Sequence, residues 1–278
     1  MEFTKMNGLG NDFVVIYGEK SLPEHVSELA VQACNRYFGI GADGFVYILP
    51  SERADFMMRI INSDGTEAEQ CGNAIRCVAK YIADHGHKDG DELTIETLGA
   101  GVQRVQLHRE NGIVKSVRVD MGAPVLEGLK VPTTVDQNPI IQHPVEVDGT
   151  TFYFTAVSMG NPHAVIYVDD AVTFDLNTWG PKLEVHPLFP RKINVEFATV
   201  NNKNQVDMRV WERGAGPTLA CGTGACATLV SSVLNEKTDR RATISLAGGD
   251  LFIEWDVTDN HVYMTGPAEF VFTGQWLK

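Results

Sequence analysis

Alternating hydrophobic and polar residues predict a chain made mainly of β-strands. The alternation is clearest over residues 93–97, 102–107 and 114–119, and a period of two residues is typical of half-buried strands. Two other runs, 74–83 and 225–234, are rich in helix-forming and apolar residues. The second is apolar on almost every face, which is typical of a buried helix. We therefore predict an α+β fold in which each of two buried helices fills the middle of its own set of strands.

The chain also repeats itself at a constant spacing of 150 residues. The matching segments are Gly10-Asn11 with Gly160-Asn161, Val15-Ile16-Tyr17 with Val165-Ile166-Tyr167, Met58-Arg59 with Met208-Arg209, and Cys71-Gly72 with Cys221-Gly222. Because these blocks stay in register without a gap, the repeat indicates two halves with one fold. Each half then brings one Cys-Gly pair to the start of its buried helix.

A stretch rich in glycine and proline, residues 122–131, is the predicted linker between the halves. We expect the first half to comprise residues 1–120 and to carry Cys71. The chain ends of two-domain proteins often lie close together, so residues 267–278 are expected to return to the first half. The second half is then residues 121–266, which carry Cys221.

Charge and composition exclude several classes of function. Lys and Arg number 23 against 36 Asp and Glu, a net charge of −13, which disfavours binding to nucleic acid. No apolar stretch approaches the roughly 20 residues that a membrane-spanning helix needs. The N-terminal residues 1–5 also lack the basic region, followed by an apolar one, of a secretory signal. We expect a cytoplasmic protein that binds neither nucleic acid nor a membrane.

The cysteines point away from disulfides and metals. The chain has five, Cys34, Cys71, Cys77, Cys221 and Cys226, and an odd number in a long chain disfavours a secreted disulfide framework. Their spacings lack the paired Cys-x-x-Cys of a structural zinc site. We expect no metal site and no cofactor.

A Cys-Gly pair at a helix start suits acid–base chemistry. The helix N-terminus presents unpaired backbone N–H groups and the positive end of the helix dipole, which can hold a carboxylate. The same environment is expected to lower the pKa of a cysteine there from about 8.5 toward neutrality. One thiolate would remove a proton from a carbon, and an opposing thiol would return one to the other face. The alternative is that Cys71 and Cys221 are only buried packing residues, but their duplicated context favours the chemistry.

Three polar residues are further candidates for the site because of where they lie in the sequence. His163 follows the repeated Gly-Asn turn and is expected to tune a nearby thiol. Glu212 and Arg213 lie shortly before Cys221, where a charged pair is suited to the amino group and carboxylate of one substrate. The Gly-rich loop 39–44 is not a phosphate site, because it has neither a following Lys-Ser/Thr nor a complete Gly-x-Gly-x-x-Gly.

Several motifs resemble those of the diaminopimelate epimerases. They are Gly8-Leu9-Gly10-Asn11-Asp12-Phe13, Ser158 to His163, Asn194-Val195-Glu196-Phe197, Trp211-Glu212-Arg213-Gly214, Leu219 to Cys226 and Tyr263-Met264-Thr265-Gly266-Pro267. The resemblance runs nearly end to end. It implies two pseudo-symmetric halves, each a barrel-like, mostly antiparallel sheet around a central helix. It also implies a cofactor-independent enzyme that interconverts LL- and meso-diaminopimelate for lysine and peptidoglycan synthesis. We expect it to act as a homodimer.

The resemblance also implies roles for individual residues. Cys71 and Cys221 would be the acid–base pair, and His163 and Glu212 would tune the thiols. The substrate contacts would be Asn11, Asn62, Gly72, Asn73, Asn161, Asn194, Glu212, Arg213, Gly222 and Thr223. This chain departs from the family pattern at Gly44, where some relatives carry a Gln contact, at Ala74, where Gly is usual, and at Pro217, where an acidic residue is usual.

Three rival functions remain open on the sequence. Proline racemase-like enzymes share the fold and two cysteines, but they lack the Trp211-Glu212-Arg213 block. A single-cysteine hydrolase would form an acyl-enzyme on Cys221 alone. A non-catalytic amino-acid-binding module would bind its ligand without proton exchange.

Overall fold

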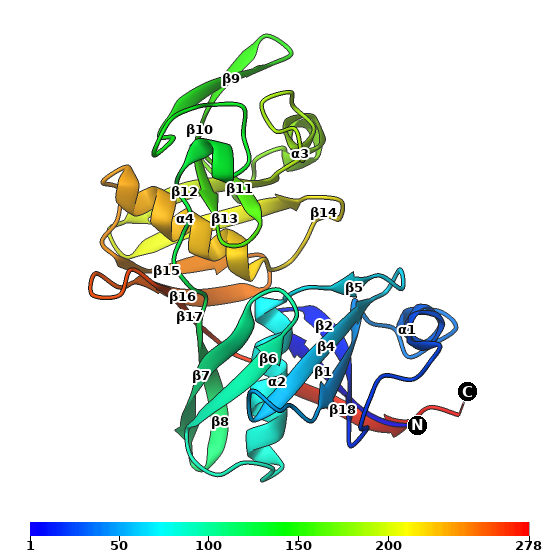
Figure 1. Cartoon of the computed structure of the whole chain (residues 1–278). Helices are drawn as coiled ribbons and strands as arrows, with labels where there is room; N and C mark the ends of the chain where they lie inside the picture. The colour runs from blue at the N-terminus through cyan, green and yellow to red at the C-terminus, as the bar shows by residue number, and fades with distance from the viewer. Residues whose placement is uncertain (278) are drawn as a thin grey trace. The chain divides into compact units, whose positions relative to one another are not determined.

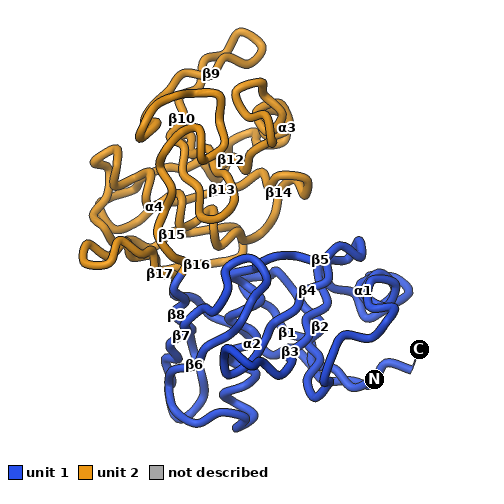
Figure 2. The backbone as a smooth tube through the Cα atoms, viewed as in Figure 1, with its two compact units in different colours: residues 1–120, 265–278 blue, residues 121–264 orange. Residues whose placement is uncertain are grey.

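The structure is a computed structural model that describes residues 1–277. The chain divides into two compact units, residues 1–120 with 265–278 and residues 121–264 (Figure 2). The stretch expected to be a linker, 122–131, belongs to the second unit, where it forms a short 3-10 helix, η1 (Gly128–Lys130), and buries Val131. Strands outnumber helices in both units, so the predicted α+β class is confirmed (Figure 1).

Unit 1 is a sheet wrapped around one helix. Its elements are β1 (Glu2–Gly8), β2 (Asn11–Tyr17), α1 (Val26–Cys34), β3 (Gly44–Leu49), β4 (Phe56–Asn62), β5 (Glu67–Ala68), α2 (Gly72–Asp84), β6 (Glu92–Thr97), β7 (Gly101–Glu110), β8 (Ile113–Asp120) and β18 (Glu269–Gln275). Hydrogen bonding gives the order β18-β1-β2-β3-β4-β6-β7-β8, in which β2–β3 and β4–β6 are parallel and the other pairs antiparallel. Helix α2 packs on β1, β2, β4, β6, β7 and β8, so the sheet encloses it.

Unit 2 repeats this arrangement. Its elements after η1 are β9 (His143–Val147), β10 (Thr150–Ser158), β11 (Pro162–Tyr167), α3 (Leu176–Glu184), β12 (Asn194–Asn202), β13 (Gln205–Glu212), β14 (Gly216–Pro217), α4 (Gly222–Leu234), β15 (Arg241–Leu246), β16 (Gly249–Trp255) and β17 (Val262–Gly266), whose last two residues fall in unit 1. The parallel pairs are β11–β12 and β13–β15. Helix α4 packs on β10, β11, β12, β13, β15 and β16.

The repeat seen in the sequence extends to the pairing of single residues. Phe13 pairs with Gly44 across β2 and β3, and His163 pairs with Asn194 across β11 and β12, which are the same positions shifted by 150. Helices α2 and α4 are each 13 residues long and begin directly after their cysteine. Both helices are almost wholly buried, as predicted.

One helix is shorter than its sequence pattern suggests. The amphipathic pattern of residues 24–38 predicts a helix that ends at Gly39, but α1 ends at Cys34. Asn35 has an extended backbone, and its side-chain oxygen accepts hydrogen bonds from the N–H groups of Tyr37 and Phe38 at 2.9 Å. A side chain that competes for backbone N–H groups in this way ends a helix.

A buried arginine anchors the start of α2, and its loss is expected to destabilise the protein. Arg76 is 0% exposed, its Nε donates to the carbonyl of Pro267 and its Nη1 to that of Gly72, each at 3.0 Å. Arg76→Ala is expected to lower the free energy of unfolding by about 3 kcal/mol, because the carbonyls of Gly72 and Pro267 lose charged donors and a cavity remains. Urea denaturation measures this.

The matched control is Arg241→Ala, the same truncation at an exposed position at the start of β15. Its free energy of unfolding should stay within about 0.5 kcal/mol of the parent protein. Equal effects of the two substitutions would contradict the anchoring role of Arg76.

Candidate active site

Cys71 precedes the first residue of α2, and two asparagines meet beside it. Its carbonyl accepts the hydrogen bond from Ile75 that opens the helix. Its thiol donates to Asn11 Oδ1 at 3.7 Å, and Asn73 Nδ2 donates to the same oxygen at 3.2 Å. The hairpin that carries Asn11 has positive φ at Leu9 (59°) and Gly10 (84°), the geometry of a tight two-residue hairpin turn. The turn thus places Asn11 at the helix start.

Charged residues that sequence analysis missed hold Asn11 in place. Asn11 Nδ2 donates to Asp43 Oδ2 at 2.8 Å, and Arg36 donates to Asp43 at 2.8 Å and to Asp12 at 2.8 and 3.2 Å. Burial opposes ionisation of Asp12, but the hydrogen bonds from Arg36 and Lys5 outweigh it and lower the pKa of Asp12. Asp43 lies in the Gly-rich loop 39–44 and is the polar residue of that loop. Its presence was the signal in the sequence that could have identified it as a candidate.

Of the other predicted site residues of unit 1, Gly72 and Asn73 lie beside Cys71, whereas Asn62 is hydrogen-bonded elsewhere. Gly72 and Asn73 are the first buried residues of α2. Asn62 ends β4 and is half-buried, but its Nδ2 donates to Thr66 Oγ1 at 3.0 Å within the adjacent turn. The structure therefore joins Cys71, Asn11 and Asn73 by hydrogen bonds, while the hydrogen bond of Asn62 goes to its own turn.

Cys221 has the equivalent position in unit 2, directly before α4. It is 6% exposed, and its sulfur lies 3.5 Å from Thr223 Oγ1. Asn161 Nδ2 donates to that hydroxyl at 3.2 Å. Asn161 and Thr223 are the repeat equivalents of Asn11 and Asn73, so the equivalent pair is hydrogen-bonded in both units, with Asn11 accepting in unit 1 and Asn161 donating in unit 2. Gly222 and Gly224 are buried in the first turn of α4.

His163 is wholly buried beneath this cluster. Its Nδ1 lies 2.6 Å from Glu196 Oε1, and its Nε2 lies 3.0 Å from Asn161 Oδ1. Glu196 is also 0% exposed. Sequence analysis gave Glu196 no role, although it lies in the quoted Asn194–Phe197 motif. Its burial in β12, which only the structure shows, marks Glu196 as a candidate, because an ionisable group without access to solvent must be paired.

Asn194, Glu212 and Arg213 meet at the edge of β12 and β13. Asn194 Nδ2 donates to the carbonyl of Pro162 at 2.8 Å, and Asn194 Oδ1 accepts from the backbone N–H of Arg213 at 2.9 Å. Glu212 accepts from Thr218 Oγ1 at 2.5 Å, and burial raises its pKa. The Arg213 side chain is exposed and donates to the carbonyl of Arg191 at 3.3 Å.

The environment of Cys221 corrects one expectation from the sequence. Burial, and then the carboxylates of Glu212 and Glu196, raise the pKa of the Cys221 thiol well above its ordinary value, although Thr223 and the backbone N–H of Gly224 act in the opposite direction. The prediction that the helix N-terminus would lower this pKa is therefore wrong for Cys221. Desolvation of a buried thiol outweighs the helix terminus.

Gly224 lets Glu196 and Cys221 approach the same turn of α4. A Cβ at residue 224 would lie 2.7 Å from Glu196 Oε1 and 3.2 Å from Cys221 Sγ. Gly224→Ala is expected to lower the free energy of unfolding by about 1–3 kcal/mol through overpacking, and to lower any turnover that depends on Cys221 because the carboxylate and sulfur must move. Thermal unfolding and turnover measure the two effects.

The repeat supplies the control for that substitution. The equivalent of Gly224 in unit 1 is Ala74, which is buried, and the equivalent of Glu196 is Val46. Ala74→Gly creates no clash, so turnover should stay within about twofold of the parent, with a loss of about 1 kcal/mol from helix propensity. Loss of turnover in Ala74→Gly and not in Gly224→Ala would contradict this account.

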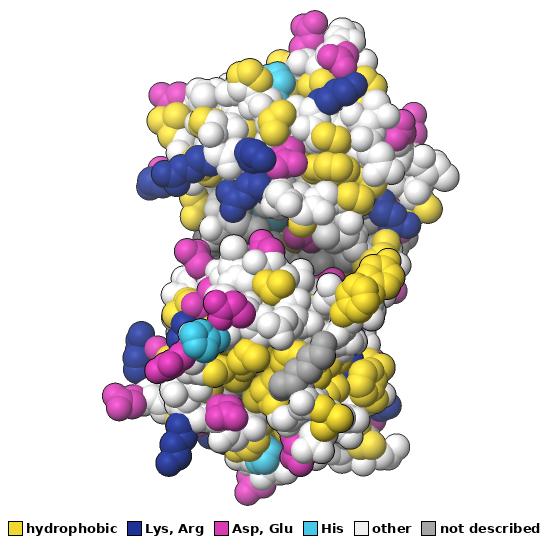
Figure 3. Space-filling model, turned by 90° about the vertical axis from the view of Figure 1, so that its right-hand side faces the viewer, with side chains coloured by type: hydrophobic (Ala, Val, Ile, Leu, Met, Phe, Trp, Pro, Cys, Tyr) yellow, Lys and Arg dark blue, Asp and Glu magenta, His cyan; other side chains and the backbone are white. Residues whose placement is uncertain are grey.

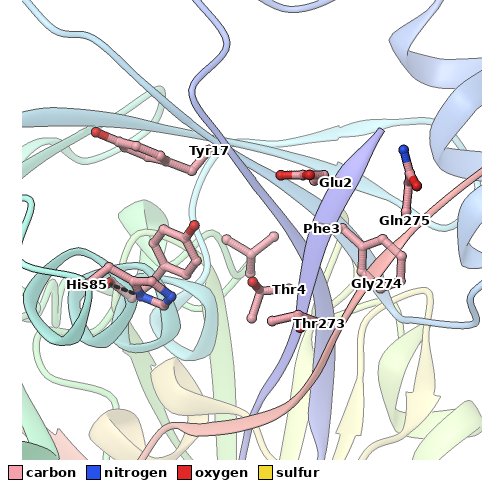
Figure 4. A pocket seen from close by; sticks show the side chains of 10 residues that line it. Glu2, Phe3, Thr4, Tyr17, His85, Thr273, Gly274 and Gln275 are labelled. Carbon is pink, nitrogen blue, oxygen red and sulfur yellow. Dashed lines mark hydrogen bonds between the residues drawn. The ribbon is translucent and has the colours of Figure 1, made fainter.

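A hollow on unit 1 lies apart from these residues. Its volume is about 480 Å³, and it is lined by residues of β1, β2, α2 and β18, among them Tyr17, Tyr81, His85 and Gln275 (Figure 4). None of the predicted site residues lines it. Within residues 1–277, no three His, Cys, Asp or Glu side chains come together in a way that could hold a metal ion.

Comparisons with known proteins show which family this chain resembles. The diaminopimelate epimerase family model matches residues 3–127 and 155–271. The chain is 54% identical over 275 residues to diaminopimelate epimerase of Acetivibrio thermocellus, covering 99% of this chain and 98% of that protein. It is 53% identical over 281 residues to diaminopimelate epimerase of Desulfitobacterium hafniense, covering 100% of this chain and 99% of that protein.

A solved structure with little sequence identity shares the fold. A probable proline racemase from Agrobacterium radiobacter K84 matches with a TM-score of 0.73 at 15% identity, over 99% of this chain and 92% of that chain. The likeness supports the two-domain α+β architecture. Because the family model matches most of the sequence and the relatives match it along its whole length, the chain belongs to the diaminopimelate epimerase family of isomerases.

Proposed function

We propose that this enzyme interconverts LL- and meso-diaminopimelate by a two-cysteine proton transfer at the α-carbon. The observation that supports it best is the pair of matched half-sites. Each unit holds a cysteine directly before an enclosed helix, and an asparagine of the equivalent hairpin is hydrogen-bonded to the first turn of that helix. A site made twice from one fold suits a reaction in which two opposite faces of one carbon are treated alike.

The chemistry balances without a co-reactant. One cysteine, as thiolate, takes the α-proton and becomes a thiol, and the electron pair of the broken C–H bond is delocalised into the substrate carboxylate. The opposing thiol then gives its proton to the other face and becomes a thiolate. After the product leaves, the cysteine that was the thiolate carries the proton and the other cysteine is the thiolate. The reverse reaction therefore uses the two cysteines in exchanged roles. The raised pKa of Cys221 supports a resting enzyme in which Cys221 carries the proton.

The substrate contacts follow from the same half-sites. The developing carbanion needs fixed donors at its carboxylate, and we assign these to the helix starts at Gly72-Asn73 and Gly222-Thr223. The remaining amino and carboxyl groups are assigned to Asn11, Asn62, Asn161, Asn194, Glu212 and Arg213. His163 and Glu212 act on the protonation of Cys221, which their burial near it supports.

The proposal includes a place in metabolism and in the cell. The reaction would supply meso-diaminopimelate for lysine and peptidoglycan precursors, in the cytoplasm. Among residues 1–277, no helix combines the length and apolar character that crossing a membrane requires.

We also propose a homodimer. On unit 1, the exposed apolar residues of β18 are Phe270, Val271 and Phe272, at 37%, 55% and 48% exposed, and hydrophobic side chains gather on the face that Figure 3 shows. An exposed apolar strand is a frequent interaction surface. Sedimentation velocity is expected to give twice the mass of the chain over a range of concentrations. A single species with the mass of one chain at high concentration would contradict the dimer.

The deciding experiment for the function is NMR of LL-diaminopimelate with purified, reduced protein in D₂O. Loss of the α-proton signal together with appearance of the meso form is the expected result. Proline, tested in parallel, should keep its α-proton. No exchange from folded, reduced protein would contradict the proposed reaction and favour a binding module or another substrate.

A further inference from the structure

Glu196 is the most buried acid near the Cys221 thiol, and it is not one of the proposed substrate contacts. It is 0% exposed in the middle of β12, and its Oε1 lies 2.6 Å from His163 Nδ1. Its Oε2 is buried without a hydrogen-bond partner among the described residues. Burying a carboxylate in this way destabilises the folded protein unless neighbouring groups compensate its charge.

The orientation of Asn161 assigns one proton of His163 to Nε2. Asn161 Nδ2 donates to Thr223, so its Oδ1 is turned toward His163 Nε2 at 3.0 Å. An amide oxygen only accepts, so Nε2 donates to it, while Nδ1 faces the Glu196 carboxylate. Glu196, His163, Asn161 and Thr223 thus form one continuous chain that ends 3.5 Å from the Cys221 sulfur.

Unit 1 lacks this chain, although it repeats the rest of the site. The repeat equivalents of His163 and Glu196 are Phe13 and Val46, which are buried apolar residues at 3% and 0% exposed. The equivalent strand pairs have the same register, Val15 with Val46 and Val165 with Glu196. The buried acid and imidazole therefore distinguish the Cys221 half-site from the Cys71 half-site.

We propose that Glu196 is a positioning residue for the Cys221 half-site: it holds the imidazole of His163 through Nδ1 and, through Asn161 and Thr223, fixes the place and the proton of the Cys221 thiol. The assignment of proton transfer to Cys221 rests on the proposed function. The hydrogen-bonded chain itself does not.

The charges around Cys221 give the direction of the expected change. In unit 2, the titratable side chains that act on the thiol are Glu212 from β13, Glu196 from β12 and, through Glu196, His163 from β11. A negative charge beside a thiol opposes its ionisation. Replacing Glu196 by glutamine keeps an acceptor for Nδ1 but removes the charge, so the thiol should ionise more readily.

The test compares alkylation of Cys221 by iodoacetamide in two Cys71→Ala proteins, with and without Glu196→Gln, at a fixed pH of about 8. Peptide mass spectrometry follows Cys221 alone. Because only the thiolate reacts, a pKa lowered by one unit makes alkylation about tenfold faster, and about tenfold is the expected result. Rates within about twofold of each other, or slower alkylation with glutamine, would overturn the proposal.

Glu184→Gln is the matched control. Glu184 is a buried carboxylate of unit 2 that binds Trp211 Nε1 and Lys192, and it is not among the charges that act on Cys221. Its alkylation rate should equal that of the Cys71→Ala parent. A tenfold acceleration here too would mean that loosening of the unit, and not the charge of Glu196, exposes the thiol, and would overturn the assignment.

Two further measurements keep the proposal testable. With Cys71 intact, Glu196→Gln should lower kcat for epimerisation at least tenfold and leave KM within about twofold. If the parent protein does not epimerise diaminopimelate, the proposed function fails. The alkylation comparison still decides the role of Glu196 in that case. If Glu196→Gln does not fold, ¹⁵N-histidine spectra of the parent protein decide instead. A proton on both ring nitrogens of His163 supports the proposal, and an unprotonated Nδ1 overturns it.

Discussion

Replacing Cys71 or Cys221 by alanine is expected to lower kcat for epimerisation by about 10²–10⁴-fold, the range by which a positioned acid or base accelerates proton transfer. The two losses should be of similar size, because each reaction cycle needs both sulfurs. NMR in D₂O measures the loss of the α-proton and the formation of the other isomer in one experiment. Substrate binding, followed by calorimetry, should survive in both variants.

Cys34→Ala is the control for these substitutions. Cys34 is a buried cysteine at the end of α1, and it takes no part in the hydrogen bonds described around Cys71 and Cys221. Its turnover should stay close to that of the parent protein. Loss of turnover in Cys221→Ala alone, with Cys71→Ala unaffected, would favour the single-cysteine hydrolase. Unchanged binding with no exchange in the parent would favour the amino-acid-binding module.

Glu212→Gln is expected to lower kcat/KM about a hundredfold, the scale for losing one fixed polar contact to a transition state. It should also move the high-pH limb of the kcat/KM profile to lower pH. The carboxylate of Glu212 is one cause of the raised pKa of Cys221, so without it the thiol loses its proton at lower pH. The profile reports the pair of thiols, because activity needs one of them protonated and the other ionised.

The control for this change is Glu146→Gln, which removes an exposed carboxylate on β9. Its rate and pH profile should match those of the parent. A limb that stays in place, or moves to higher pH, in Glu212→Gln would show that Glu212 does not act on Cys221.

Most of the strands and both buried helices could be predicted from the sequence, because the patterns that mark them are local or periodic. Strict alternation marked β6, β7 and β8, and the apolar runs marked α2 and α4. A hairpin turn with positive φ at Gly10 could also be read from its residues. The end of α1 could not, because the Asn35 side chain takes the N–H groups that would continue the helix.

The sequence by itself determined that two equivalent Cys-Gly pairs, 150 residues apart, begin two buried helices. It also determined the family, since motifs over the whole chain carry the resemblance. Only the tertiary structure decided which charges reach Cys221. Glu196 and Glu212 arrive from two neighbouring strands, and their burial with the thiol raises its pKa, whereas the helix start alone predicted a lower one. The physical reason is that desolvation depends on every segment that packs around a group, and no local pattern contains that information.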